Sequence, residues 1–316
     1  MSGNSGDLRI AVVGTGGIGG YFGGCLAAAG HDVRFLARGE DLAALRSEGL
    51  SITGDSTSWA VPEVLVSDSP QAIGEVDFVL LCVKTMQLSA AAAALGPLIG
   101  EDTAVVTVQN GVEAPGRVAA VIGRGRVLPG VVRVVATKAG PGRIRHVGGP
   151  GAVAFTEWDS SASKRVLRLR EALTNARLAT PEPKDIWTAL WSKFLLMAPV
   201  GSIGAATGGA TIGELRSREG TRRMLIAGMR EVQETGIALG IGLPADAVDT
   251  AIRLADQQHP EARTSLQQDI LAGRPSELDA WTGAVVRLAH RAGREAPVHE
   301  MLYELLVVRS NNVRPQ

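Results

Sequence analysis

The sequence has few of the features that mark secreted or metal-binding proteins. It contains two cysteines, Cys25 and Cys82, and no spacing of cysteine and histidine that matches a zinc site. Both lie in apolar surroundings, which favours buried free thiols in a reducing compartment over the one disulfide that they could form. No apolar run follows the N-terminus, so no signal peptide is predicted and we expect a cytoplasmic protein.

An excess of charge of either sign is also missing. The 32 Lys and Arg residues balance the 32 Asp and Glu residues, which favours neither nucleic acid nor an anionic membrane as a partner. We expect a small-molecule substrate, and a homodimer is left open. The least charged long stretch, Ile186 to Gly213, is interrupted by Pro199 and several glycines and contains Lys193. It predicts a buried core helix and not a membrane span.

What is present is material for two globular domains, since the 316 residues are 45% hydrophobic and 20% charged. Apolar runs predict strands at 8–13, 32–37, 77–83, 103–108, 127–136 and 152–155, and helices are predicted at 17–29, 40–47 and 90–95. This alternation indicates βαβ units and a mostly parallel sheet. After about Thr180 only helices are predicted, at 186–206, 211–239, 245–257, 276–292 and 298–311. We therefore predict an α/β domain at residues 1–181 and an all-helical domain at 182–316.

A glycine motif at the start of the chain gives the first domain a function. Gly14, Thr15, Gly16, Gly17, Ile18 and Gly19 form a G-x-G-x-x-G between a predicted strand and a predicted helix. Gly14 permits a tight turn, Gly16 lets the backbone approach a pyrophosphate, and Gly19 lets the helix pack close to the strand. The helix N-terminus then offers N–H groups to phosphates. The motif predicts a Rossmann-type dinucleotide-binding domain; the alternative is a glycine-rich turn that binds nothing.

The residue after the second predicted strand favours NADP. Sites for NAD usually place an acid about 20 residues beyond the motif, where it holds the ribose hydroxyls. This sequence has Arg38 there, and a guanidinium binds a 2′-phosphate that a carboxylate would repel. Arg34, in the middle of the strand, is a weaker second candidate. The alternative is that Arg38 is an ordinary solvated arginine.

Two lysines stand alone in apolar stretches. Lys84 is the only charged residue between Asp77 and Glu101, just past a predicted strand, where ligands bind in open α/β sheets. Lys193 is the only charged residue between Asp185 and Glu214. Each either snorkels to solvent, pairs, or takes part in chemistry. Desolvation of Lys193 would lower its pKa and make it a better proton donor near neutral pH.

Three groups of segments make a pattern that covers nearly the whole chain. They are Ile10–Gly19 with Arg38; Cys82–Gln87 with Gln109–Val112; and Leu190–Phe194 with Ser265–Asp269 and Gly273–Asp279. The third group, with its W-x-K-F and G-R-x-x-E-x-D patterns, is far more specific than the glycine motif. Together the segments resemble the ketopantoate reductase (2-dehydropantoate 2-reductase) family.

The resemblance implies an NADPH-dependent reduction of ketopantoate to D-pantoate, a step toward pantothenate and coenzyme A, by a Rossmann domain followed by a helical one. Lys193 matches the general acid that protonates the carbonyl oxygen as the cofactor delivers hydride to carbon. Glu277 matches an acid that anchors the cofactor and shapes the site. Further cofactor contacts are implied for Lys84, Gln87, Asn110 and the backbone of Ala136. Substrate contacts are implied for Asn110, Lys193, Ser265 and positions 197 and 201.

The substrate half departs from the family pattern. Family members typically carry asparagines one and two turns after the lysine, where this chain has Met197 and Gly201, and a further asparagine expected near Thr211 is absent. Each lost hydrogen bond costs about 1 kcal/mol net. Three hypotheses follow: a ketopantoate reductase, a paralogous NADPH-dependent reductase of another 2-oxo acid or carbonyl, and a non-enzymatic NADPH sensor. The presence of Lys193 and Glu277 argues against the sensor.

Overall fold

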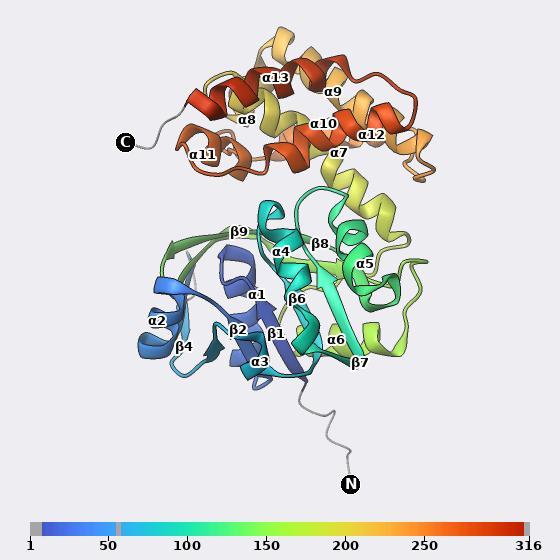
Figure 1. The fold of residues 1–316 in the computed structure, drawn as a ribbon. Coiled ribbons are helices and arrows are strands. Elements are labelled where there is room, and N and C mark those ends of the chain that lie inside the picture. Colours follow the sequence, from blue (N-terminus) through green and yellow to red (C-terminus); the bar gives the residue numbers. More distant parts are fainter. Residues whose placement is uncertain (1–7, 55–57, 313–316) are drawn as a thin grey trace. The chain divides into compact units, whose positions relative to one another are not determined.

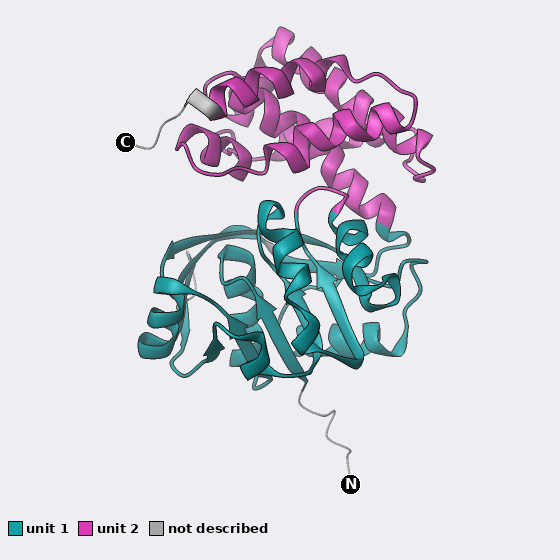
Figure 2. Ribbon diagram, viewed as in Figure 1, with its two compact units in different colours: residues 1–109, 114–186 teal, residues 110–113, 187–316 magenta. Residues whose placement is uncertain are grey.

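The computed structural model describes residues 8–54 and 58–312. The chain divides into two compact units (Figure 2). Unit 1 comprises described residues of 1–109 and 114–186, and unit 2 comprises 110–113 and 187–316. The sequence placed a boundary at 181 and did not anticipate that 110–113 would group with the second unit. As a statement about independently folding domains, the predicted boundary stays a prediction.

Unit 1 is built on a nine-stranded sheet with the order β4-β3-β9-β8-β7-β6-β1-β2-β5 in the described residues. The strands are β1 (Arg9–Val13), β2 (Asp32–Leu36), β3 (Leu50–Gly54), β4 (Ser58–Val61), β5 (Leu65–Ser67), β6 (Val76–Leu81), β7 (Ile99–Thr107), β8 (Val127–Gly140) and β9 (Arg143–Phe155). β1 pairs in parallel with β2 and β6, whereas β8 and β9 form a long antiparallel hairpin. The sheet is therefore parallel around β1 and mixed at the side of the hairpin.

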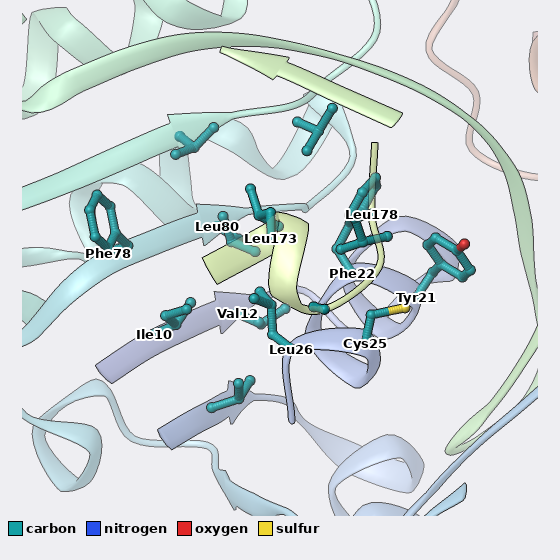
Figure 3. Close-up of a cluster of buried hydrophobic side chains, with 14 of the residues drawn as sticks. Ile10, Val12, Tyr21, Phe22, Cys25, Leu26, Phe78, Leu80, Leu173 and Leu178 are labelled. Carbon is teal, nitrogen blue, oxygen red and sulfur yellow. The ribbon is translucent and has the colours of Figure 1, made fainter. Parts of the chain in front are cut away.

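Helices cover both faces of this sheet (Figure 1). They are α1 (Gly17–Ala28), α2 (Gly39–Glu48), α3 (Pro70–Ile73), α4 (Leu88–Ala93), α5 (Ala114–Ile122) and α6 (Lys164–Asn175). One buried cluster joins α1 and α6 to the strands through residues such as Leu26, Leu80 and Leu173 (Figure 3). A second cluster packs α3, α4 and α5 on alternate strand residues such as Ala11 and Val79. Two-sided burial explains why the central strands read as continuous apolar runs.

Unit 2 is helical in its described part. Its helices are α7 (Ile186–Ala206), α8 (Ile212–Ser217), α9 (Glu219–Ala238), α10 (Ala247–Gln257), α11 (Ser265–Leu271), the π-helix η4 (Asp279–Gly283), α12 (Ala284–Arg291) and α13 (Pro297–Asn312). α7 runs over the predicted range and continues through Pro199. The single helix predicted at 211–239 is wrong: a capping box of Thr211 and Glu214 starts α8, and an extended Arg218 separates it from α9.

By length and composition, α7 is long and apolar enough to cross a membrane, and among the described helices it is the one that meets this test. Core helices can meet it too, and 72% of the relevant stretch is buried inside the structure.

In unit 1, the predicted free thiols are confirmed: neither Cys25 nor Cys82 is in a disulfide.

Candidate active site

The glycine loop of unit 1 has the backbone geometry that its sequence predicts. Gly14 adopts a positive φ of 99°, which L side chains rarely take. A Cβ on Gly19 would lie 1.9 Å from the carbonyl oxygen of Gly14. A Cβ on Gly17 would lie 2.1 Å from the carbonyl oxygen of Ala136 in β8. Three glycines are thus required by tight turns and close backbone approaches within the protein itself.

Gly16 differs from these three, because a Cβ there would meet nothing within 4 Å. It is the N-cap of α1, it has no side-chain cap, and the first turn of the helix contains no acidic residue. The space beside Gly16 is therefore open, and the first N–H groups of the helix, which have no partner within it, lie at the positive end of the helix dipole. This arrangement fits the pyrophosphate of a dinucleotide, which needs open space and unshielded N–H donors.

The two arginine candidates for a 2′-phosphate differ in their contacts. Arg38 is an exposed N-cap residue of α2, and within residues 8–54 and 58–312 its guanidinium makes no hydrogen bond or ion pair. Arg34 instead donates to both carboxylate oxygens of Asp32, at 3.0 and 3.1 Å, and to the carbonyl oxygen of Ile73. Hydrogen bonds from Arg34 and Arg9 hold the pKa of Asp32 below its usual range. Arg34 has a structural role, which leaves Arg38 as the better candidate.

Lys84 and Gln87 follow β6 at its carboxyl end. Lys84 is the N-cap of the short helix η1 (Thr85–Gln87), and both side chains are exposed. Gln109, to which the sequence gave no role, is buried and donates to the carbonyl oxygens of Leu81 and Val83, at 2.6 and 3.1 Å. It ties the chain after β7 to the chain after β6. A polar residue directly after an apolar strand was the signal that could have identified it.

Between Leu81 and Val83, Cys82 packs behind the glycine loop. A Cβ on Gly19 would lie 3.0 Å from that of Cys82. The residue is only partly buried, but its side chain lines the apolar core, and burial raises the pKa of the thiol to about 12. The thiol is therefore protonated at neutral pH and is not a nucleophile.

Unit 2 brings together three residues that the sequence proposed for the site. The Nζ atom of Lys193 in α7 donates to Oδ1 of Asn110 at 2.9 Å. Nδ2 of Asn110 donates to Oε2 of Glu277 at 3.4 Å, a long contact. All three side chains are half-buried. An ammonium group can face only the oxygen of the amide, so the lysine fixes the orientation of Asn110.

A second network holds the segment 110–113 against the helices of unit 2. Arg287 of α12 donates to Glu113 at 2.9 Å and to Asp279 at 2.6 Å, and Tyr303 donates to Asp279 at 3.2 Å. Gly111 has a φ of 92°, and a Cβ there would lie 2.8 Å from the carbonyl oxygen of Ala280. These contacts position Asn110 and Glu277 together, and sequence reasoning missed them because the partners lie far apart in the chain.

The proposed substrate residues occupy different environments. Ser265 is exposed at the first position of α11, after a capping box formed by Thr264 and Gln267. Met197 is partly exposed one turn beyond Lys193. Gly201 is buried, because a Cβ there would lie 2.9 Å from Cζ3 of Trp281. Substrate contact at all three positions stays a prediction.

Family models match both parts of the chain. The ketopantoate reductase PanE/ApbA model matches residues 10–160, and the ketopantoate reductase PanE/ApbA C-terminal model matches residues 185–310. The chain belongs to the ketopantoate reductase family. The 2-dehydropantoate 2-reductase of Mesorhizobium japonicum is 32% identical, over 95% of this chain and 97% of that protein. The predicted family and fold class are confirmed.

Solved structures agree with this assignment. A PanE/ApbA family ketopantoate reductase from Ralstonia eutropha JMP134 has a TM-score of 0.87 and 30% identity, over 96% of this chain and 98% of that one. D-mandelate dehydrogenase, solved with NADH and anilino(oxo)acetate, also gives a TM-score of 0.87, but at 20% identity it shows only a shared fold. Membership of the family makes this chain an oxidoreductase that acts on a carbonyl or CH–OH group with a nicotinamide dinucleotide.

Proposed function

We propose that this protein reduces 2-dehydropantoate to D-pantoate with NADPH, a step toward pantothenate and coenzyme A. The observation that carries the proposal is the hydrogen-bonded series from Lys193 through Asn110 to Glu277. It gives a reductase of this family a half-buried proton donor whose position is fixed by its neighbours. A sensor that only binds a dinucleotide has no need of such a donor.

Each part of the proposed site has a separate task. The loop 14–19 binds the pyrophosphate, Arg38 binds the 2′-phosphate, and Lys84, Gln87, Ala136 and Glu277 complete the cofactor contacts. The bound nicotinamide supplies the hydride. As negative charge develops on the carbonyl oxygen, Lys193 Nζ donates a proton to it. Asn110 holds that ammonium group through its Oδ1, so the donor is oriented before the substrate arrives.

The direct test is NADPH oxidation, followed by the nicotinamide absorbance, across a panel of 2-oxo acids that includes 2-dehydropantoate. We expect 2-dehydropantoate to give the highest kcat/KM and chiral analysis of the product to give the D isomer. If every 2-oxo acid leaves NADPH unoxidised, the proposal is wrong.

One observation favours a second candidate, a paralogous reductase of a more apolar 2-oxo acid. The α7 surface after Lys193 presents Met197, which packs against a buried cluster that contains Trp281, Leu266 and Leu278. A hydroxyl placed on such a surface loses its hydrogen bonds to water. If an unhydroxylated 2-oxo acid has the highest kcat/KM in the panel, this candidate replaces the first.

The choice of cofactor gives the first prediction. Arg38 is exposed and lies at the N-terminus of α2, so we expect NADPH to bind at least about tenfold more tightly than NADH, ~1.4 kcal/mol. Arg38→Ala should weaken binding of NADPH and leave NADH nearly unchanged, since only NADPH carries the 2′-phosphate. Titration calorimetry with both cofactors measures this. Equal affinities in the wild type would refute it, and Arg46→Ala, at an exposed position in the last turn of α2, is the control.

The wall beside Lys193 gives the second prediction. Met197 lies one helical turn after the lysine and carries no hydrogen-bonding group that could pair with a substrate hydroxyl. We expect the wild type to prefer 2-dehydropantoate over its deoxy analogue, 2-oxo-3,3-dimethylbutanoate, by less than about a thousandfold in kcat/KM. Met197→Asn should raise that ratio. A wild-type preference above this value would mean that other groups recognise the hydroxyl.

A further inference from the structure

The surface of α7 beyond Lys193 is closed by an aromatic side chain from another element. Gly201 lies two helical turns after Lys193, and an ideal Cβ there would be 2.9 Å from Cζ3 and 3.1 Å from Cε3 of Trp281, and 3.1 Å from Oγ1 of Thr264. The indole, together with the Thr264 hydroxyl, therefore occupies the volume in which a side chain at position 201 would lie. Trp281 is 1% exposed, so solvent has almost no access to the indole.

Trp281 is held firmly in this place. It belongs to the π-helix η4, which begins two residues after Glu277. The next residue, Thr282, shares a hydrogen bond of 2.7 Å with Ser202 of α7, and both hydroxyls are buried. π-helical turns often occur at functional sites. Here the turn connects Glu277, in the proposed site, to the indole that covers Gly201.

The indole also carries a buried Nε1–H that has no hydrogen-bond partner within the described part of the chain. An unpaired buried donor is unfavourable for stability, and a purely apolar side chain would fill the core without it. The N–H group therefore brings no advantage at this position, and what the residue contributes is the volume of its ring.

On the basis of the proposed function, we propose that Trp281 sets the depth of the substrate pocket and so restricts the enzyme to 2-oxo acids with short, compact apolar side chains. A carbonyl oxygen at Lys193 Nζ places the carbon chain of the substrate along the α7 face. That face remains partly exposed at Met197 and ends at Gly201, under the indole. Specificity is then set by a residue that is distant in sequence from both the lysine and the glycine.

The experiment compares kcat/KM for 2-oxobutanoate, 2-oxohexanoate and 2-oxooctanoate in the wild type, Trp281→Leu and Trp281→Phe. We expect Trp281→Leu to raise the ratio for 2-oxooctanoate over 2-oxobutanoate by at least about tenfold, the discrimination that about one methylene gives in an apolar pocket. The smaller change, Trp281→Phe, should give an intermediate ratio and protects the test against a loss of folding.

Trp191→Leu is the matched control. Trp191 is a buried tryptophan of α7, but it packs against Gly236, where a Cβ would lie 2.9 Å from its Cε3. Its loss removes the same volume from the core, so we expect lower stability and an unchanged ratio. An equal rise in both tryptophan variants, or no rise in Trp281→Leu, would overturn the proposal.

A second measurement does not depend on activity. Gly201→Ala should lower the Tm of the wild type, because its Cβ meets the indole, and should lower it less in Trp281→Leu, where only the contact with Thr264 Oγ1 remains. Additive effects would mean that the indole does not fill the space at position 201, which overturns the inference while leaving the proposed function intact. A wild type that reduces no 2-oxo acid, with the Tm coupling present, would instead overturn the proposed function and the inference that rests on it.

Discussion

Lys193→Ala should lower kcat by about a hundredfold or more, because a positioned general acid typically contributes a factor of this size or larger. The variant should fold, since alanine favours helix and the lysine side chain is only half-buried in α7. It leaves Asn110 Oδ1 without the donor that now lies at 2.9 Å. Steady-state kinetics with saturating NADPH and the preferred 2-oxo acid measure the effect.

Lys184→Ala is the control for this variant. Lys184 is exposed just before α7, so its removal changes the net charge equally without touching the site. Binding of NADPH to Lys193→Ala, measured by calorimetry, should stay within a few-fold of the wild type. A Lys193→Ala variant that keeps most of its turnover would return the lysine to an ordinary snorkelling role.

The parts of the fold that the sequence predicted well are those with a strong local signal. β1 and β6 are almost continuous apolar runs because both of their faces are covered. The lengths of the two hairpin strands were underestimated: they were predicted at 127–136 and 152–155, whereas β8 extends to Gly140 and β9 begins at Arg143. Its outer half is exposed and contains several glycines and arginines, so neither apolar content nor β-branching reveals it.

In the candidate site, too, the sequence predicted the features that have a local signal and missed those that depend on distant residues. The glycine loop was predictable because Gly14 has a local backbone angle that favours glycine, and Gly19 contacts the carbonyl oxygen of Gly14, only five residues earlier. Asn110 and Lys193 were each proposed as site residues, but the hydrogen bond between them was not predicted. The segment that carries Asn110 is held by the Arg287 network, whose members lie between positions 113 and 303 of the chain. Nothing in the sequence indicated that the ring of Trp281 lies beside Gly201, because the presence of a glycine does not indicate which side chain packs on it.

The glycine loop also separates folding from cofactor binding, which gives the last prediction. Gly19→Ala places a Cβ 1.9 Å from a backbone oxygen, so α1 must move away from the turn after β1. Overpacking of this kind costs about 1–3 kcal/mol, and each kcal/mol lowers the Tm of a domain of this size by about 2–4 °C. NADPH affinity should fall as well, because the displaced helix no longer presents its N–H groups correctly.

Gly16→Ala, unlike Gly19→Ala, should affect cofactor binding without affecting folding. Its Cβ enters open space, and the φ of −72° at this position suits any residue. The apo Tm should change little, since alanine in place of an N-cap glycine costs no more than about 1 kcal/mol. NADPH affinity should nevertheless fall by about a hundredfold, ~2.7 kcal/mol, because the methyl group takes the space through which the backbone N–H groups reach the pyrophosphate. Thermal melting without cofactor and calorimetry with NADPH separate the two effects. A Gly16→Ala variant with unchanged affinity would show that the pyrophosphate does not lie against this turn, and the loop would then be a structural turn and not the phosphate site.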